Sequence, residues 1–171
     1  MKLMPIAILD ADSQAKFLRF QKIALDRGVK MNVLNPHITM ATYFLPDLDN
    51  YLAEVREKLV DMRSFNVFYP EVTYMKEWDT VTCNPVKDEE LLQAYRKITS
   101  VMPEYLHENY RTEENFTPHT TIVGRTPYDL NQIYGDIQKE FTPFKALVTR
   151  IDFSVEIREG EFEIIHFIDL V

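Results

Sequence analysis

The sequence predicts an α+β domain built from two similar halves. Apolar segments of strand length alternate with amphipathic segments along all 171 residues, as expected for strands packed against helices. Two segments also read almost alike, Asn35-Pro36-His37-Ile38-Thr39-Met40 and Thr117-Pro118-His119-Thr120-Thr121-Ile122, and an amphipathic segment follows each. If an approximate two-fold axis relates the halves, two antiparallel sheets meet with helices outside, and both His-x-Thr segments line one central groove.

The first half, roughly residues 1–86, contains an apolar run after the N-terminus and two amphipathic stretches. Asp12 or Ser13 provides an N-cap for the first helix and Gly28 a stop, while Asp47 caps the second. Segments rich in β-branched and aromatic residues predict the remaining strands. The expected elements are strand 4–9, helix 12–27, strand 37–44, helix 47–62, and strands 65–75 and 78–86.

The second half, roughly 87–171, repeats this plan, and strand exchange between the halves is possible. Asp88 caps its first helix, and Thr126-Pro127 provides the N-cap and first position of its second. Glu159-Gly160-Glu161 predicts a tight turn between two long strands. The expected elements are a helix from 88, a polar stretch at 103–117, strand 119–125, a helix from 126, and strands at 144–157 and 162–170.

Composition indicates one domain over residues 1–171 and excludes several classes of protein. No apolar run approaches the ~20 residues of a membrane span, and no signal peptide is recognisable. A single cysteine, Cys83, cannot form an intrachain disulfide, so we expect a cytoplasmic protein. The formal net charge of −8 argues against long duplex nucleic acid as partner but permits a short anionic substrate. We expect a monomer.

The two His-x-Thr segments are the main candidates for chemistry. In a strand, residues i and i+2 share a face, so His37 lies beside Thr39 and His119 beside Thr121. Ile38 and Met40 then face the opposite side and can pack on helices. Imidazole exchanges protons near neutral pH, and a neighbouring hydroxyl can bind a phosphoryl oxygen. Chance His-x-Thr pairs are the alternative, although the proline before each histidine argues against it.

Three further side chains are candidates for substrate contacts. Strand alternation places Tyr43 on the His37 face, where it either stacks on a base or fills the sheet surface. Arg125 follows the second motif and either neutralises a phosphate or is a plain surface arginine. Trp78, the single tryptophan, is expected in a strand near Tyr74, where packing competes with base stacking.

The chain resembles the two-histidine (2H) phosphoesterase superfamily, with its LigT-like and 2′-5′ RNA ligase-like cyclic phosphodiesterases. His37-Ile38-Thr39-Met40 matches the His-apolar-Thr/Ser-apolar motif in full, and His119-Thr120-Thr121-Ile122 departs from it only at Thr120. The resemblance implies a bilobal LigT-like α+β fold with the active groove between the lobes. It also implies that His37 and His119 are the acid–base pair, and that Thr39 and Thr121 hydrogen-bond the phosphate.

The expected activity is metal-independent hydrolysis of a nucleotide or oligonucleotide phosphodiester, namely a 2′,3′-cyclic phosphate, a 2′-5′ linkage or a cyclic oligonucleotide. Two imidazoles can deprotonate the nucleophile and protonate the leaving oxygen, so no metal or other cofactor is required. A metal site using both histidines lacks a third ligand at a helpful spacing. RNA 2′-5′ end joining, and a nucleotide- or RNA-binding module without catalysis, remain the alternative functions.

Overall fold

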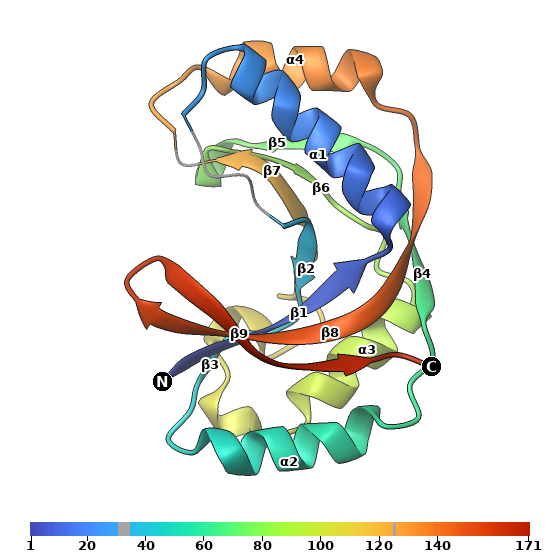
Figure 1. Cartoon of the computed structure of the whole chain (residues 1–171), viewed down its shortest axis with the longest axis vertical. Helices are drawn as coiled ribbons and strands as arrows, with labels where there is room; N and C mark the ends of the chain where they lie inside the picture. Colours follow the sequence, from blue (N-terminus) through green and yellow to red (C-terminus); the bar gives the residue numbers. More distant parts are fainter. Residues whose placement is uncertain (31–34, 125) are drawn as a thin grey trace.

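The structure is a computed structural model that describes residues 1–30, 35–124 and 126–171. Helices α1 and α4 lie at one end of the molecule, α2 and α3 lie at the other, and the strands run between them (Figure 1). Three short 3₁₀ turns, η1 (Lys76–Trp78), η2 (Pro103–Tyr105) and η3 (Glu108–Tyr110), complete the assigned elements of the described chain. The helices are α1 (Ala11–Asp26), α2 (Leu48–Leu59), α3 (Glu89–Thr99) and α4 (Leu130–Glu140).

Nine strands of the described residues form two antiparallel sheets, as the sequence predicts. The larger sheet, sheet A, has the order β2-β1-β8-β4, with β3 added beside β1 and β9 beside β8. The smaller, sheet B, has the order β5-β6-β7. The strands are β1 (Lys2–Leu9), β2 (His37–Thr39), β3 (Tyr43–Phe44), β4 (Phe65–Tyr69), β5 (Val72–Met75), β6 (Thr80–Cys83), β7 (Thr120–Gly124), β8 (Phe144–Arg158) and β9 (Glu161–Asp169).

Both halves of the chain contribute to each sheet. Strands β8 and β9 of the second half pair with β1 and β4 of the first, while β5 and β6 of the first half pair with β7. The single strand expected at 65–75 is wrong, because Pro70 and Glu71 separate β4 from β5 and the two strands enter different sheets. The sheets are therefore shared between the two halves of the sequence.

Side-chain caps determine where the helices begin. Asp47 and Asp88 accept hydrogen bonds from the backbone at Asn50 and Leu91, as predicted for α2 and α3. The expected caps of the other two helices are wrong by two or three residues. Asp10 caps α1, because its carboxylate accepts from both the amide and the hydroxyl of Ser13, and Asp129 caps α4.

The core lies between the sheets and the helices. Ile38 and Met40 are fully buried and belong to the hydrophobic core. The expected strand 37–44 is interrupted after Thr39 and resumes at Tyr43, so its alternation does not continue across residues 40–42.

The turn at residues 159–161 is confirmed, since Gly160 adopts a positive φ of 76° between β8 and β9. Within the described chain, no helix has the length and apolar character of a membrane span.

Candidate active site

The two His-x-Thr motifs come together where β2 of sheet A lies against β7 of sheet B (Figure 1). His37 opens β2, and His119 immediately precedes β7. Both side chains are half-buried, so each ring keeps part of its surface accessible. The rings are near enough for the charge of His119 to act on His37. The structure thus unites two motifs that are distant in sequence.

Each imidazole is held by the backbone just before its own motif. The Nδ1 atom of His37 lies 2.7 Å from the carbonyl oxygen of Asn35, and Nδ1 of His119 lies 2.9 Å from that of Thr117. A carbonyl oxygen only accepts, so Nδ1 must carry the proton and donate it in both rings. Each Nε2 is therefore left to gain or lose a proton, and both rings have the same tautomer when neutral.

The environment of His37 favours its neutral form. Burial lowers the pKa of His37 below its ordinary value, and the nearby charge of His119 lowers it further. The Asn35 carbonyl and the carboxylate of Asp152 act in the opposite direction but do not cancel the effect of burial on this pKa. A ring that is neutral at physiological pH can accept a proton from a nucleophile.

Each histidine is followed, two residues later in the chain, by the expected threonine. Thr39 shares the face of His37 on β2, and Thr121 pairs with Thr82 across β6 and β7. Both threonines are half-buried. No hydrogen bond from either side chain is found within the part of the chain that the structure describes. Their hydroxyls can therefore donate to a bound anion without first breaking a described bond.

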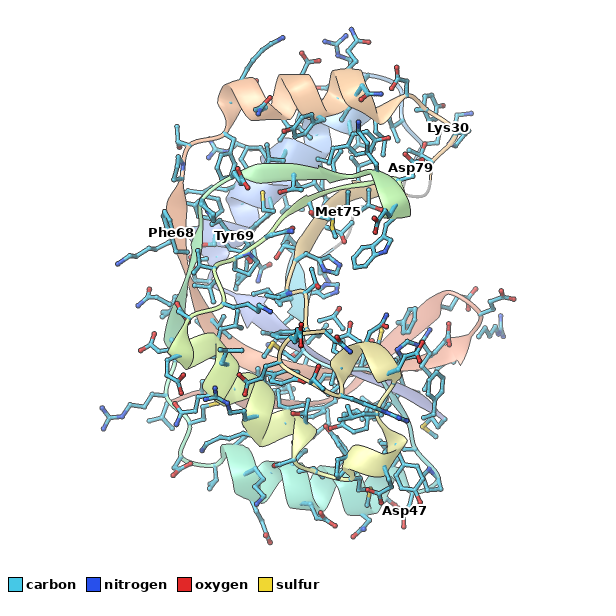
Figure 2. All side chains as sticks on the ribbon, turned by 180° about the vertical axis from the view of Figure 1, so that it is seen from behind. Lys30, Asp47, Phe68, Tyr69, Met75 and Asp79 are labelled. Carbon is cyan, nitrogen blue, oxygen red and sulfur yellow. The ribbon has the colours of Figure 1, made fainter. Side chains whose placement is uncertain are left out.

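Trp78 joins this group from a different element than expected. It lies in η1, the turn between β5 and β6, rather than in a strand. The indole is 46% exposed, and its ring centroid lies 5.3 Å from that of His119, at an interplanar angle of 59°. Met75 immediately precedes this turn and Asp79 immediately follows it, and both are labelled in Figure 2. An exposed indole beside an imidazole can stack on a planar ligand.

One of the predicted contact residues, Tyr43, is not brought to the site. Tyr43 is fully buried, and its hydroxyl donates to the carbonyls of Ile98 at 2.7 Å and Val101 at 3.1 Å. The expectation that Tyr43 stacks on a substrate base is therefore wrong: after the break in the strand, its side chain turns toward the helices. Arg125 lies outside the described residues.

The structure adds an ion pair that the sequence analysis missed. Arg150 and Asp152 of β8 lie on the same face of sheet A as His37, and Nε of Arg150 lies 2.6 Å from Oδ1 of Asp152. Asp152 is only 3% exposed, which is unusual for a carboxylate. A signal was present in the sequence, since Arg150, Asp152 and Ser154 alternate with the apolar Ile151, Phe153 and Val155.

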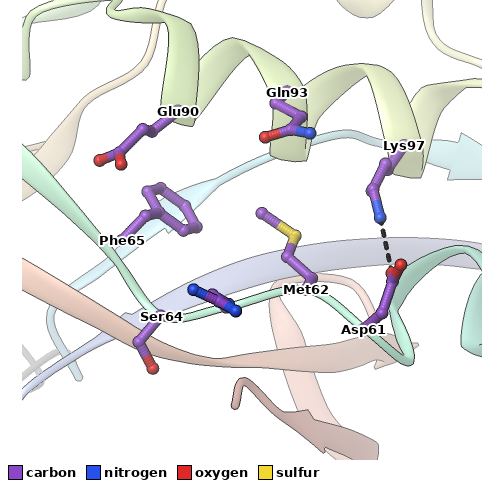
Figure 3. A pocket seen from close by; sticks show the side chains of 8 residues that line it. Asp61, Met62, Ser64, Phe65, Glu90, Gln93 and Lys97 are labelled. Carbon is purple, nitrogen blue, oxygen red and sulfur yellow. Dashed lines mark hydrogen bonds and ion pairs between the residues drawn. The ribbon is translucent and has the colours of Figure 1, made fainter.

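Other concave regions lie elsewhere. A cavity of about 300 Å³ between the end of α2, the start of β4 and helix α3 is lined by Met62, Phe65, Gln93 and Lys97 among others, and by none of the predicted site residues (Figure 3). Lys97 donates to Asp61 at 2.9 Å inside it. No group of three or more His, Cys, Asp or Glu side chains among the described residues is arranged to hold a metal ion.

Comparisons with known proteins agree with this architecture. The fold matches TT0787 of Thermus thermophilus with a TM-score of 0.73 at 16% identity, covering 99% of this chain and 98% of that one. It matches E. coli LigT with a TM-score of 0.69 at 12% identity, covering 99% and 97%. Usb1 of Kluyveromyces marxianus is more distant, with a TM-score of 0.55 at 10% identity, covering 99% and 98%.

Sequence comparison gives the family. A search of curated proteins finds no match. The family model described as the 2′-5′ RNA ligase superfamily matches residues 11–159, a range that contains both His-x-Thr motifs. The chain therefore belongs to the 2′-5′ RNA ligase superfamily, the group of two-histidine phosphoesterases with the LigT-like fold.

Proposed function

We propose that the protein is a phosphodiesterase that opens a nucleotide or oligonucleotide diester by acid–base catalysis, with His37 and His119 as the proton-transfer pair. The observation that carries this proposal is the matched arrangement of the two rings. Each holds its Nδ1 proton on a backbone carbonyl, each keeps Nε2 available, and β2 and β7 bring the two together.

The reaction needs one proton removed and one supplied. For a 2′,3′-cyclic phosphate, a water oxygen forms a bond to phosphorus while the bond from phosphorus to one ribose oxygen breaks. A neutral imidazole takes the proton that the water loses, and the protonated imidazole opposite gives its Nε2 proton to the leaving oxygen. The product is a phosphate monoester, and proton exchange with solvent restores the starting protonation states.

The remaining residues of the site suit an anionic nucleotide. The hydroxyls of Thr39 and Thr121 would donate to the non-bridging phosphate oxygens, where negative charge accumulates in the transition state. Trp78 offers a face for a nucleobase beside His119. A nucleotide ligand is also supported by E. coli LigT, whose structures include complexes with 3′-AMP, ATP and NADP+.

The proposal is tested by incubating the purified protein with nucleoside 2′,3′-cyclic phosphates, 2′-5′-linked oligoadenylates and cyclic oligonucleotides, with and without excess chelator. We expect hydrolysis of at least one of these diesters at the same rate in both conditions. Loss of turnover on chelation would contradict the metal-independent mechanism. Binding of these nucleotides without any product would favour a binding module instead.

End joining uses the same two proton transfers in reverse and is the second candidate, because the matching family is described as RNA ligases. Incubating RNA ends that carry a 2′,3′-cyclic phosphate with 5′-hydroxyl RNA separates the two activities. Accumulation of a joined product, rather than an opened cyclic phosphate, would favour ligation over hydrolysis.

A further inference from the structure

The face of sheet A that carries the first motif continues past the histidine. Paired residues of antiparallel strands share a face, so Ile8 of β1 lies between His37 on one side and Arg150 on the other. In the next row, Ile6 lies between Thr39 and Asp152. Neighbouring strands are ~4.8 Å apart, which puts the backbone of Arg150 about 10 Å from that of His37.

The guanidinium of Arg150 is fixed in place on this face. Nη2 donates to Oδ2 of Asp152 at 3.0 Å, and Nε approaches the other carboxylate oxygen to 2.6 Å. The guanidinium carbon also lies 5.2 Å from the centre of the Phe167 ring, which β9 places opposite Asp152. A guanidinium held by a carboxylate and an aromatic ring loses little further freedom when it binds a ligand.

This ion pair is incompletely satisfied. The contact between Nε of Arg150 and Oδ1 of Asp152 is close but poorly aligned, so neither atom completes a hydrogen bond within the described part of the chain. Of the five N–H groups of Arg150, one on Nη2 donates a hydrogen bond to Asp152, and the Arg150 side chain remains 39% exposed. Asp152, in contrast, is almost fully buried and cannot be the group that meets a ligand.

We propose that Arg150 binds a second phosphate of the substrate, one nucleotide unit away from the phosphate held between His37 and His119. This inference rests on the proposed function and narrows its substrate class to nucleotides with more than one phosphate. Arg150 contacts the substrate directly and gives specificity for ligands with a second phosphate. Asp152 and Phe167 are positioning residues that act through Arg150.

Three features favour a phosphate as the ligand. The guanidinium presents N–H groups in a planar fork, which matches the oxygens of a phosphate. Arg150 shares its sheet face with the motif that is proposed to hold the reacting phosphate, so one nucleotide can span both positions. A nucleobase alone would leave the free N–H groups of the exposed guanidinium without a charged partner.

The experiment compares two ligands that cannot react and that differ by one phosphate. Calorimetry gives the Kd of adenosine 3′-monophosphate and of adenosine 3′,5′-bisphosphate for the wild-type protein. A hydrogen bond to a charged group is worth ~1.5–3 kcal/mol, so we expect the bisphosphate to bind about ten- to a hundred-fold more tightly. A 3′-phosphorylated deoxydiadenylate carries its second phosphate as an internal diester instead of a terminal monoester. Whichever of this dinucleotide and the bisphosphate binds more tightly shows whether Arg150 prefers a diester or a terminal phosphate.

The informative variant is R150M combined with D152N, because R150M alone leaves a buried carboxylate without its partner. Any effect on His37 changes the binding of both ligands alike, so the ratio of their affinities reports on Arg150. We expect this ratio to fall to about one. R158M is the matched control, since Arg158 lies on the same strand with its side chain 81% exposed, and it should keep the wild-type ratio.

Equal binding of the two ligands by the wild-type protein would overturn the inference, as would a ratio that survives in R150M/D152N. Absence of binding by either ligand would overturn it too. A protein that shows the expected ratios but hydrolyses no diester keeps the Arg150 site and loses the proposed activity, so the two failures are distinguishable.

Discussion

The two His-x-Thr motifs have the same local geometry but different surroundings. At both, a histidine donates its Nδ1 proton to the carbonyl two residues earlier and lies beside a half-buried threonine. Around His37, the six-stranded sheet A supplies the buried Asp152 and its partner Arg150. Around His119, the three-stranded sheet B supplies an exposed indole, that of Trp78.

This difference separates chemistry from recognition. The shared features are those that two interchangeable proton carriers need: a fixed tautomer, a free Nε2 and a nearby hydroxyl. The features that differ are a guanidinium on the His37 side and an indole on the His119 side, so a bound substrate meets different groups at its two ends. We infer that the near-symmetric centre transfers protons, while the asymmetric flanks orient the substrate.

The largest expected effect comes from removing either member of the symmetric pair. His37→Ala and His119→Ala should each lower kcat by about 10²- to 10⁴-fold, because general acid–base catalysis supplies that factor. Steady-state kinetics on the best diester of the panel measures the loss. Circular dichroism and thermal melting should show that both variants remain folded.

His166→Gln is the control for this pair. His166 also belongs to sheet A, but its ring lies 5.9 Å from Phe153, on the face away from His37, and Nε2 lies 3.0 Å from Arg56. We expect wild-type turnover. A wild-type rate for His37→Ala or His119→Ala would contradict the assignment of the two histidines as the proton-transfer pair.

A smaller effect should distinguish the flanks. Stacking on an aromatic side chain is worth about 1–3 kcal/mol per base, so Trp78→Ala should raise KM by about five- to a hundred-fold and leave kcat nearly unchanged. Phe68→Ala is the matched control, because Phe68 is 37% exposed on β4, on the side of the molecule away from Asp79 (Figure 2). An unchanged KM at Trp78→Ala would remove the indole from the binding surface.

The sequence was sufficient where local chemistry decides the structure. Asp47 and Asp88 cap helices, and Gly160 forms the turn of the last hairpin. Each of the two motifs lies at the start of a strand. All of these features depend on neighbours within a few residues. The convergence of His37 and His119 followed from the assumption of two related halves rather than from any local signal.

Long-range placement is where the sequence was insufficient. The Trp78 ring lies beside the His119 ring although η1 and the second motif are about forty residues apart in the chain. Asp152 lies on the same face as His37 because only one strand, β1, separates β8 from β2. Tyr43 was misplaced because alternation holds only while a strand is continuous. Strand pairing across the chain determines all three positions, and periodicity within one segment does not report it.

A further prediction concerns the support of the Trp78 side. A Cβ added at Gly124 of β7 would lie 2.5 Å from Oγ1 of Thr80, whose hydroxyl donates to the Trp78 carbonyl at 2.8 Å. Gly124→Ala should therefore lower the free energy of unfolding by about 1–3 kcal/mol, measured by urea denaturation, and weaken ligand binding through Trp78.

Gly135→Ala is the control for that substitution. Gly135 lies in α4, and nothing lies within 4 Å of a Cβ added there. Because alanine favours the helix over glycine, this variant should be more stable by about 0.4–1 kcal/mol. Equal stability of the two variants would show that the close approach of Gly124 and Thr80 does not constrain β7.

The smallest expected effect tests whether the two imidazoles are neighbours. Burial and the His119 charge lower the pKa of His37 in the folded protein, so below pH ~6.5 the unfolded chain binds a proton there more readily than the folded one. The stability that the neutral ring confers is therefore complete above this pH and is lost as the pH falls through the folded pKa. His37→Gln should lose less stability than the wild type between pH 7.5 and pH 5.5, measured by urea denaturation.

His119→Gln should also reduce that loss, because it removes the second positive charge. A double-mutant cycle of the two substitutions should then be additive at pH 7.5 and show a coupling of about 0.5–1 kcal/mol at pH 5.5, because the charge of His119 lowers the pKa of His37. Additivity at both pH values would mean that the rings do not sense each other. The two motifs would then be separate sites, and one phosphate could not lie between them.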